Sequence, residues 1–336
     1  MLKIKRFYVN LIEKERKNFF EIFFYFFLYF LSLLYGVIIN LRNFFFDYGI
    51  LPIHFIDKKV ISVGNISWGG SGKTSLVIYL HQELCKRFKV ASITKGYAKD
   101  EFFLLKDKLK YVFDSKDRVL LLKRLRDDFD LFILDDGFQY RKLNRDLDIV
   151  VMGAKEFIKK KLLLPAYILR EPLKSLRRAD IVILTCPDKI PDINSVKESL
   201  LKINPHLKIY LADYQFKGFL DRDRNVKDDS YFKSRNFAAL TAIGNPEGFI
   251  SLLKNLNIRI KRVMIYPDHY EFNARDIFRI EEDLKKCGVG DVVITYKDLY
   301  HLDFSRANLN YFILEIELKI KDEANLLKDI ENTIHI

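Results

Sequence analysis

A glycine-rich stretch near residue 70 constrains the fold of this chain more than any other feature. It reads Val-Gly-Asn-Ile-Ser-Trp-Gly-Gly-Ser-Gly-Lys-Thr over residues 63–74, between an apolar run at 60–63 and a helical pattern at 75–88. A strand, a glycine turn and a helix start together can cradle a phosphate, because backbone N–H groups and the positive end of the helix face one point. We expect Lys73 to reach the outer phosphates and Thr74 to hold Mg²⁺.

One position of this loop departs from the usual pattern. The pattern has glycine five residues before Gly72, and this chain has Ser67 there. A glycine-rich turn that binds nothing is the alternative interpretation, but the preceding strand and the following helix favour a phosphate-binding loop. The predicted nucleotide-binding residues are Ser67, Gly69, Gly70, Ser71, Gly72, Lys73 and Thr74.

An acidic pair follows a second apolar run, at 129–134. The run ends in Asp135-Asp136-Gly137. A strand that ends in carboxylates beside a phosphate loop can supply the second protein ligand of a Mg²⁺ ion. By itself such a sequence also fits an ordinary turn. Because the phosphate loop is present, we expect Asp135 or Asp136 to face the metal.

Size, charge and cysteine content bound the remaining possibilities. The 336 residues suffice for two α/β domains with sizeable cores. A formal net charge of +12 favours an acidic partner such as nucleic acid, anionic lipid or a phosphorylated substrate, although charge alone discriminates little. The widely spaced Cys85, Cys186 and Cys287 form neither a metal motif nor a disulfide framework, so we expect small buried residues in a reducing compartment.

The N-terminal part predicts a membrane-associated helix. Residues 22–39 carry no charge and are mainly Phe, Leu, Tyr and Ile; a helix of this length reaches about 27 Å, the lower limit of a membrane span. If the helix crossed, its basic N-terminal flank would stay in the cytoplasm and the phosphate loop would face the side without ATP. We therefore expect it to dip into or lie on the inner leaflet, on the cytoplasmic face. A buried core helix is the alternative.

The order of apolar and helical runs predicts an α/β fold in two parts. Strands and helices alternate up to about residue 210, which is typical of a doubly wound parallel sheet like that of P-loop NTPases. A polar, irregular stretch at 213–229 predicts the domain boundary, and a second α/β pattern begins at 237. The predicted parts are a membrane-associated helical segment (1–45), the P-loop domain (46–212), a smaller α/β domain (213–320) and a C-terminal helix (321–336).

Taken in order, the motifs resemble those of the tetraacyldisaccharide 4′-kinases of lipid A synthesis, over roughly residues 20–318. The family favours Arg where Lys95 stands and Glu where Tyr296 stands, and it also lacks the glycine that Ser67 replaces. The matching segments are the apolar N-terminal helix, Val63-Gly64-Asn65-Ile66, Gly69-Gly70-Ser71-Gly72-Lys73-Thr74, Lys95-Gly96-Tyr97, Asp117-Arg118, Asp135-Asp136-Gly137-Phe138-Gln139, Leu143, Arg145-Asp146, Pro165, Leu169-Arg170-Glu171-Pro172, Arg178-Ala179-Asp180, Ile243-Gly244-Asn245-Pro246, Pro267-Asp268-His269 and Thr295-Tyr296-Lys297-Asp298.

The resemblance implies a fold, a reaction and roles for residues. The fold would be two α/β/α domains with ATP and substrate in the cleft between them. The reaction would transfer the γ-phosphoryl group of ATP to a sugar hydroxyl of a lipid A disaccharide phosphate at the inner face of the inner membrane, whose lipid would be a second partner. Lys73, Asp136 and His269 would be catalytic, with His269 orienting or polarising the sugar hydroxyl. The predicted metal ligands are Thr74, Asp135, Asp136 and Glu171.

One departure from the family concerns the general base. The family carries Gly-Asp-Glu-Pro between the Gly-Tyr turn and Asp-Arg, and its aspartate pairs with the histidine that matches His269. Here that interval is shorter and lacks the segment, although Asp100, Glu101, Asp107 and Asp114 are nearby acids. Either another carboxylate substitutes or general-base assistance, worth about 10²–10⁴ in rate, is weakened.

Two other classes of function are alternatives to the kinase. A membrane-tethered P-loop ATPase or GTPase switch would act on a protein partner. A GTPase needs Asn/Thr-Lys-x-Asp to read guanine, and residues 295–298 place the lysine one position too late. A nucleic-acid binder is suggested by charge alone and no motif supports it, so we expect no nucleic-acid partner.

Overall fold

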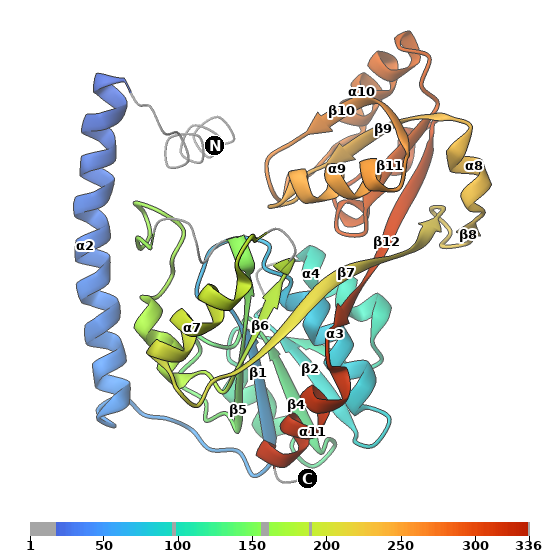
Figure 1. Ribbon diagram of the computed structural model, residues 1–336. Helices are drawn as coiled ribbons and strands as arrows, with labels where there is room; N and C mark the ends of the chain where they lie inside the picture. Colours follow the sequence, from blue (N-terminus) through green and yellow to red (C-terminus); the bar gives the residue numbers. More distant parts are fainter. Residues whose placement is uncertain (1–17, 96–98, 156–160, 188–189, 335–336) are drawn as a thin grey trace. The chain divides into compact units, whose positions relative to one another are not determined.

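The structure is a computed structural model that describes residues 18–95, 99–155, 161–187 and 190–334 (Figure 1). The basic segment at 1–17 and the Gly96-Tyr97 turn, both used in the predictions, lie outside the described residues. The chain forms two compact units. One is Tyr214–Glu317, and the other combines the chain up to Asp213 with the C-terminal part from Leu318. Each unit has its own part of the sheet and its own core.

The first unit contains a parallel sheet in the order β7-β6-β5-β1-β4-β2-β3. Its central strands are buried nearly throughout, as expected for parallel strands covered by helices, and this explains their continuous apolar runs. The predicted doubly wound parallel α/β sheet is confirmed. Its strands are β1 (Lys59–Gly64), β2 (Val90–Thr94), β3 (Val112–Asp114), β4 (Leu131–Asp135), β5 (Leu147–Gly153), β6 (Ile181–Thr185) and β7 (Lys208–Leu220).

Helices follow the strands of this unit. Residues 99–114 form a helix and the short edge strand β3. Asp117 caps the next helix, because its side chain accepts a hydrogen bond from the Leu120 N–H at 3.1 Å. The helices are α3 (Lys73–Leu84), α4 (Lys99–Lys108), α5 (Arg118–Leu125), the 3₁₀ helix η1 (Leu173–Arg178), α7 (Ile193–Ile203) and α11 (Glu323–Ile334).

The second unit has a smaller parallel sheet in the order β10-β9-β11-β12. Buried side chains of β9 and β11 pack with α9 and α10, so this unit has its own hydrophobic core. Its main elements are α8 (Asp229–Lys233), β9 (Asn236–Thr241), α9 (Pro246–Asn255), β10 (Arg259–Ile265), α10 (Ala274–Lys286), β11 (Asp291–Thr295), η3 (Asp298–Tyr300), η4 (Phe304–Arg306) and β12 (Asn310–Ile320).

The stretch 213–229 corrects one sequence interpretation. It was predicted to be irregular, but β7 continues to Leu220 and pairs in an antiparallel manner with β8 (Val226–Lys227). From Asp213 to Lys217 polar and apolar side chains alternate, and Gln215 and Lys217 are exposed while Tyr214 and Phe216 are partly buried. A strand with one exposed face looks polar in composition, which explains the wrong interpretation.

The cysteines correct a second sequence interpretation, which expected them to be buried. Cys85 and Cys287 are exposed rather than buried. Each one caps the C-terminal end of a helix, α3 and α10 respectively, where the chain turns at the surface.

The N-terminal helix α2 (Phe19–Asp47) is longer than predicted. Asn18 and Glu21 form a capping box that starts it, with the Glu21 N–H donating to Asn18 at 2.9 Å. By length and composition it could cross a membrane, and only 17% of its most apolar window is buried. This low burial speaks against the alternative of a buried core helix.

Candidate active site

The glycine-rich loop connects β1 to α3, as the sequence predicted. Gly69 and Gly72 have positive φ angles of 139° and 96°, a backbone conformation that favours glycine. Gly72 is the N-cap of α3, and Lys73 and Thr74 are the first two residues of that helix. The loop therefore presents its lysine and its threonine hydroxyl at the positive end of a helix, where phosphate binds.

A segment from far along the chain supports the first half of the loop. Ser67 pairs with Leu169 in an antiparallel bridge, and the Arg170 N–H donates to the Ile66 carbonyl at 2.7 Å. Farther along, the Asn65 side chain donates to the Ser71 hydroxyl at 3.1 Å. Ser67 is fully buried where it pairs with Leu169, whereas Gly69 and Gly70 are exposed.

Two glycines allow the acidic turn to approach the phosphate loop closely. A Cβ atom on Gly64 would lie 2.5 Å from the Phe138 Cβ, and one on Gly137 would lie 2.7 Å from the Ser62 hydroxyl. The Gly137 N–H also donates to the Val63 carbonyl at 3.0 Å. Side chains at either position would push the two turns apart, so these glycines keep the carboxylates beside the lysine.

Asp136 lies at the centre of a group of cations. Its carboxylate accepts hydrogen bonds from the Arg170 guanidinium at 2.8 and 3.0 Å, and it lies 3.8 Å from the Lys73 Nζ and 3.6 Å from the Lys95 Nζ. Burial raises the pKa of this carboxyl, but Lys73, Arg170 and Lys95 outweigh burial and hold the pKa below its usual value. Asp136 is therefore ionised, and three cations share one negative charge.

The neighbouring Asp135 has a different environment. It is almost fully buried, and this burial, with the nearby charge of Glu101, raises its pKa to about 7. Its Oδ1 is a buried oxygen without a hydrogen-bond partner in the described part of the chain. Thr74 is buried as well, and a carboxylate oxygen and a hydroxyl oxygen are both ligands of the kind that Mg²⁺ prefers.

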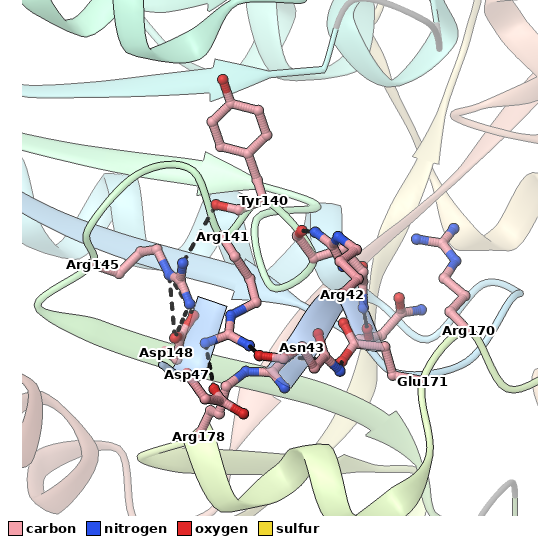
Figure 2. Close-up of polar contacts among 12 residues, drawn as sticks. Arg42, Asn43, Asp47, Tyr140, Arg141, Arg145, Asp148, Arg170, Glu171 and Arg178 are labelled. Atoms are coloured by element: carbon pink, nitrogen blue, oxygen red, sulfur yellow. Dashed lines mark hydrogen bonds and ion pairs between the residues drawn. The ribbon is translucent and has the colours of Figure 1, made fainter. Parts of the chain in front are cut away.

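Glu171, which the resemblance suggested as a further metal or substrate acid, has other partners in the structure. Its carboxylate is fully buried and accepts hydrogen bonds from Arg178 at 2.9 Å and from Asn43 of α2 at 3.0 Å (Figure 2). These bonds satisfy Oε2, while Oε1 has no partner among the described residues. The structure thus connects Glu171 to α2, and its part in metal binding stays a prediction.

His269 belongs to the second unit. It has a positive φ of 59°, and its backbone N–H donates to the Ala242 carbonyl at 3.0 Å. Its Nε2 lies 3.6 Å from the carboxylate of Asp268, and its ring lies edge-on to the ring of His301, with 5.9 Å between centroids. The half-exposed side chain is therefore held by a fixed turn at the end of β10.

Lys95 and Arg170 lie in motifs that the sequence analysis singled out, but neither residue was assigned a role there. Lys95 directly follows β2, and carboxyl ends of parallel strands are where open α/β sheets bind ligands. That position was a signal for Lys95. No local signal marks Arg170, because the bridge between Ser67 and Leu169 brings it to Asp136 from another part of the chain.

Comparison with known proteins agrees with this geometry. Residues 24–101 and 98–335 match the family described as tetraacyldisaccharide-1-P 4′-kinase, LpxK. The chain belongs to this family. The tetraacyldisaccharide 4′-kinase of Aquifex aeolicus is 36% identical over 88% of this chain and 95% of its own length, and that of Porphyromonas gingivalis is 31% identical over 86% and 91%.

A solved structure matches across both units. The crystal structure of LpxK from Aquifex aeolicus in complex with ATP aligns with a TM-score of 0.71 at 34% identity, over 90% of this chain and 97% of that one. The resemblance inferred from the motifs is therefore confirmed. A P-loop switch acting on a protein partner is not favoured, because the match extends far beyond the phosphate loop.

Proposed function

We propose that this protein transfers the γ-phosphoryl group of ATP to the 4′-hydroxyl of a tetraacyldisaccharide 1-phosphate, a step of lipid A biosynthesis. Membership in the LpxK family supports the reaction class, and its relatives carry the name of this activity. The observation that carries the proposal is the convergence of Lys73, Lys95 and Arg170 on the single ionised carboxylate of Asp136. This surplus of positive charge suits the phosphates of a nucleotide.

The roles of the loop residues follow from their positions. The backbone N–H groups from Gly69 to Thr74 cradle the phosphates at the start of α3. Lys73 then neutralises the charge that develops on the oxygens of the transferred group, and Arg170 and Lys95 share this task. Because phosphoryl transfer depends mainly on positioning and charge neutralisation, the loss of Lys73 should matter most.

The donor set fits a Mg²⁺ ion. Thr74, Asp135 and Asp136 would hold it, and the observation that supports this assignment is the buried Oδ1 of Asp135, which has no hydrogen-bond partner among the described residues. When bound, Mg²⁺ would neutralise phosphate charge. At pH 7 Asp135 is partly protonated, so binding of the ion is linked to the loss of a proton from this carboxyl.

His269 is our candidate for orienting or polarising the acceptor hydroxyl. It is half exposed on a turn of the second unit, with Asp268 beside its Nε2. The segment that supplies a partner aspartate in the family is absent here. We therefore propose that a nearby carboxylate substitutes for it, or that this chain works with weaker general-base assistance.

We place the protein at the cytoplasmic face of the inner membrane, with the lipid surface as a second partner. The exposed apolar side chains of α2 support this placement. Most side chains on its first half are Phe, Tyr, Leu and Ile, which suit the interfacial zone and the acyl chains beneath it. A lipid substrate in the same leaflet would then reach the site without leaving the membrane.

The proposed reaction is tested by incubating the purified protein with γ-labelled ATP and a tetraacyldisaccharide 1-phosphate in detergent micelles. We expect label in the lipid, at the 4′ position. ATP binding without any labelled lipid would contradict the proposed acceptor.

Thr74 offers a sharper test of the metal assignment. Thr74→Ala removes the hydroxyl and should sharply lower turnover, whereas Thr74→Ser keeps it and should retain most activity. Equal activity of wild type and Thr74→Ala would remove Thr74 from the proposed metal ligands.

A further inference from the structure

Four side chains on one face of α2 make hydrogen bonds to the body of the first unit. Their successive spacings of three, seven and one residues place the four side chains on one side of the helix. All four lie between residues 32 and 43 of the helix. The bonds run from Ser32 to the Leu163 carbonyl (2.9 Å), from Tyr35 to the Arg170 carbonyl (2.8 Å), from Arg42 to the Gln139 carbonyl, and from Asn43 to the Glu171 carboxylate (3.0 Å).

The partners of α2 lie on two segments that also hold the phosphate loop. The segment 163–171 pairs with Ser67 and donates from Arg170 to the Ile66 carbonyl. The acidic turn ends in Gln139, whose side chain donates to the Asn65 carbonyl at 2.7 Å. The helix thus contacts both segments that carry the charged groups of the site, Arg170 and Asp136.

Of these four hydrogen bonds, that of Asn43 is made to a carboxylate and the other three to backbone carbonyls. Asn43 is 8% exposed and donates to a fully buried carboxylate, which makes this a charge-assisted hydrogen bond in surroundings of low dielectric constant. Its backbone carbonyl accepts from Arg141 at 3.0 Å, and Arg141 also binds Asp47 at the end of the helix (Figure 2). The side-chain amide of Asn43, in the otherwise apolar helix α2, therefore contacts Glu171, the residue that follows Arg170.

We propose that Asn43 is a positioning residue, and that through Glu171 it holds Arg170 in the place where Arg170 meets Asp136 and the phosphates. The inference rests on the proposed function and assigns α2 a task beyond attachment to lipid. Its second half is part of the scaffold of the nucleotide site. A change at Asn43 then alters catalysis although the residue contacts neither nucleotide nor acceptor.

The Asn43→Ala variant tests the inference, with ATP and lipid acceptor at saturating concentrations in detergent micelles. Residues that orient the groups of a metal site typically contribute about 10–100-fold to activity, so we expect kcat to fall at least roughly tenfold. The matched control is Asn40→Ala, which makes the same chemical change on the same helix. The Asn40 side-chain oxygen has no partner among the described residues, and kcat should stay within twofold of wild type.

A double-mutant cycle with Arg170→Ala separates positioning from a general loss of stability. If Asn43 acts through Arg170, the Asn43→Ala change has little further effect once Arg170 is absent. If Asn43 only stabilises the docked helix, the two losses multiply, and this result would overturn the proposal. Tyr35→Phe, which removes one hydroxyl without a change of shape, should show the same coupling to Arg170 with a smaller loss.

Vesicle flotation and ATP affinity distinguish a positioning role of Asn43 from a loss of membrane binding or of the proposed acceptor. Flotation with phospholipid vesicles should be equal for wild type, Asn43→Ala and Asn40→Ala, and an activity loss that follows lost flotation would overturn the proposal. The dissociation constant of ATP, measured for the same variants, reports the coupling between Asn43 and Arg170 without the lipid acceptor. If wild type phosphorylates no lipid, the proposed function fails, while an ATP affinity that depends on Asn43 through Arg170 still supports the positioning role. Unchanged kcat and ATP affinity in a folded Asn43→Ala variant would refute that role alone.

Discussion

Two clusters of cationic side chains in the first unit are built in opposite ways. Around Asp136, three cations share one ionised carboxylate, and Lys95 is more than half exposed. At the base of α2 three arginines are each paired with one acid: Arg141 with Asp47, Arg145 with Asp148 and Arg178 with Glu171 (Figure 2).

The difference in charge balance indicates which of the two clusters binds a ligand and which one holds the structure together. A matched and buried pair has no net field to offer a ligand, and its worth lies in holding two segments in register. An unmatched group of cations at a helix start repels itself unless an anion arrives, so it is prepared for phosphate. Each prediction below changes one side of this comparison.

The largest effect is expected at the unmatched cluster. Lys73→Ala removes the cation nearest the transferred oxygens, and turnover should fall about 10²–10³-fold, as when a preorganised donor is lost from a transition state. Phosphate transfer from labelled ATP measures this loss. Lys59→Ala, which breaks the ion pair with Asp146, is the control and should leave turnover unchanged. A similar loss in both variants would contradict the assignment.

The matched cluster should instead respond in stability. Arg178→Ala leaves the fully buried Glu171 without its cation, and removing one partner of a buried pair typically costs about 3 kcal/mol or more. Urea unfolding of wild type and variant measures the difference in free energy. A difference below about 1 kcal/mol would indicate that this pair contributes no more than a surface pair.

The raised pKa of Asp135 predicts a pH dependence on the unmatched side. With a folded pKa of about 7, above the ordinary aspartate value, the folded protein binds a proton that the unfolded chain has already released. In the absence of nucleotide, this contribution to stability is therefore present at low pH and is lost as the pH rises towards 7. Asp135→Asn should remove it. Melting temperatures of wild type and variant from pH 4 to 8 should diverge with pH, and parallel curves would count against the shift.

The smallest effect is expected where charges are matched but exposed. Arg87, in the turn that follows α3, pairs with Glu331 of α11, and more than half of the Arg87 side chain is in solvent. Arg87→Ala should change the free energy of unfolding by less than about 1 kcal/mol, because water screens such a pair. A loss as large as that of Arg178→Ala would break the link between burial and structural importance.

Most of the fold could be predicted because its signals are local. The runs that became β1, β4, β5 and β6 are buried on both faces, so apolar composition alone marks them. The turn that holds Lys73 and Thr74 was readable from glycine spacing. β7 was missed at its far end because one face of that strand is polar.

The electrostatic part of the site was less readable. Lys73, Thr74, Asp135 and Asp136 follow one another in motifs, and the structure brings them together. The approach of Arg170 depends on a bridge between segments about 100 residues apart, so spacing could not reveal it. For the same reason the sequence did not connect Glu171 with α2, 128 positions away.

The comparison is tested most directly by the ATP affinity of two arginine variants, Arg170→Ala and Arg145→Ala, measured by calorimetric titration. A hydrogen bond to a charged group contributes roughly 1.5–3 kcal/mol, so Arg170→Ala should weaken ATP binding at least about tenfold. Arg145 is buried and paired with Asp148. Arg145→Ala should therefore lower stability but leave the ATP affinity of the folded protein within twofold of wild type. Equal losses of affinity in the two variants, or none in Arg170→Ala, would contradict the view that unmatched cations bind the nucleotide.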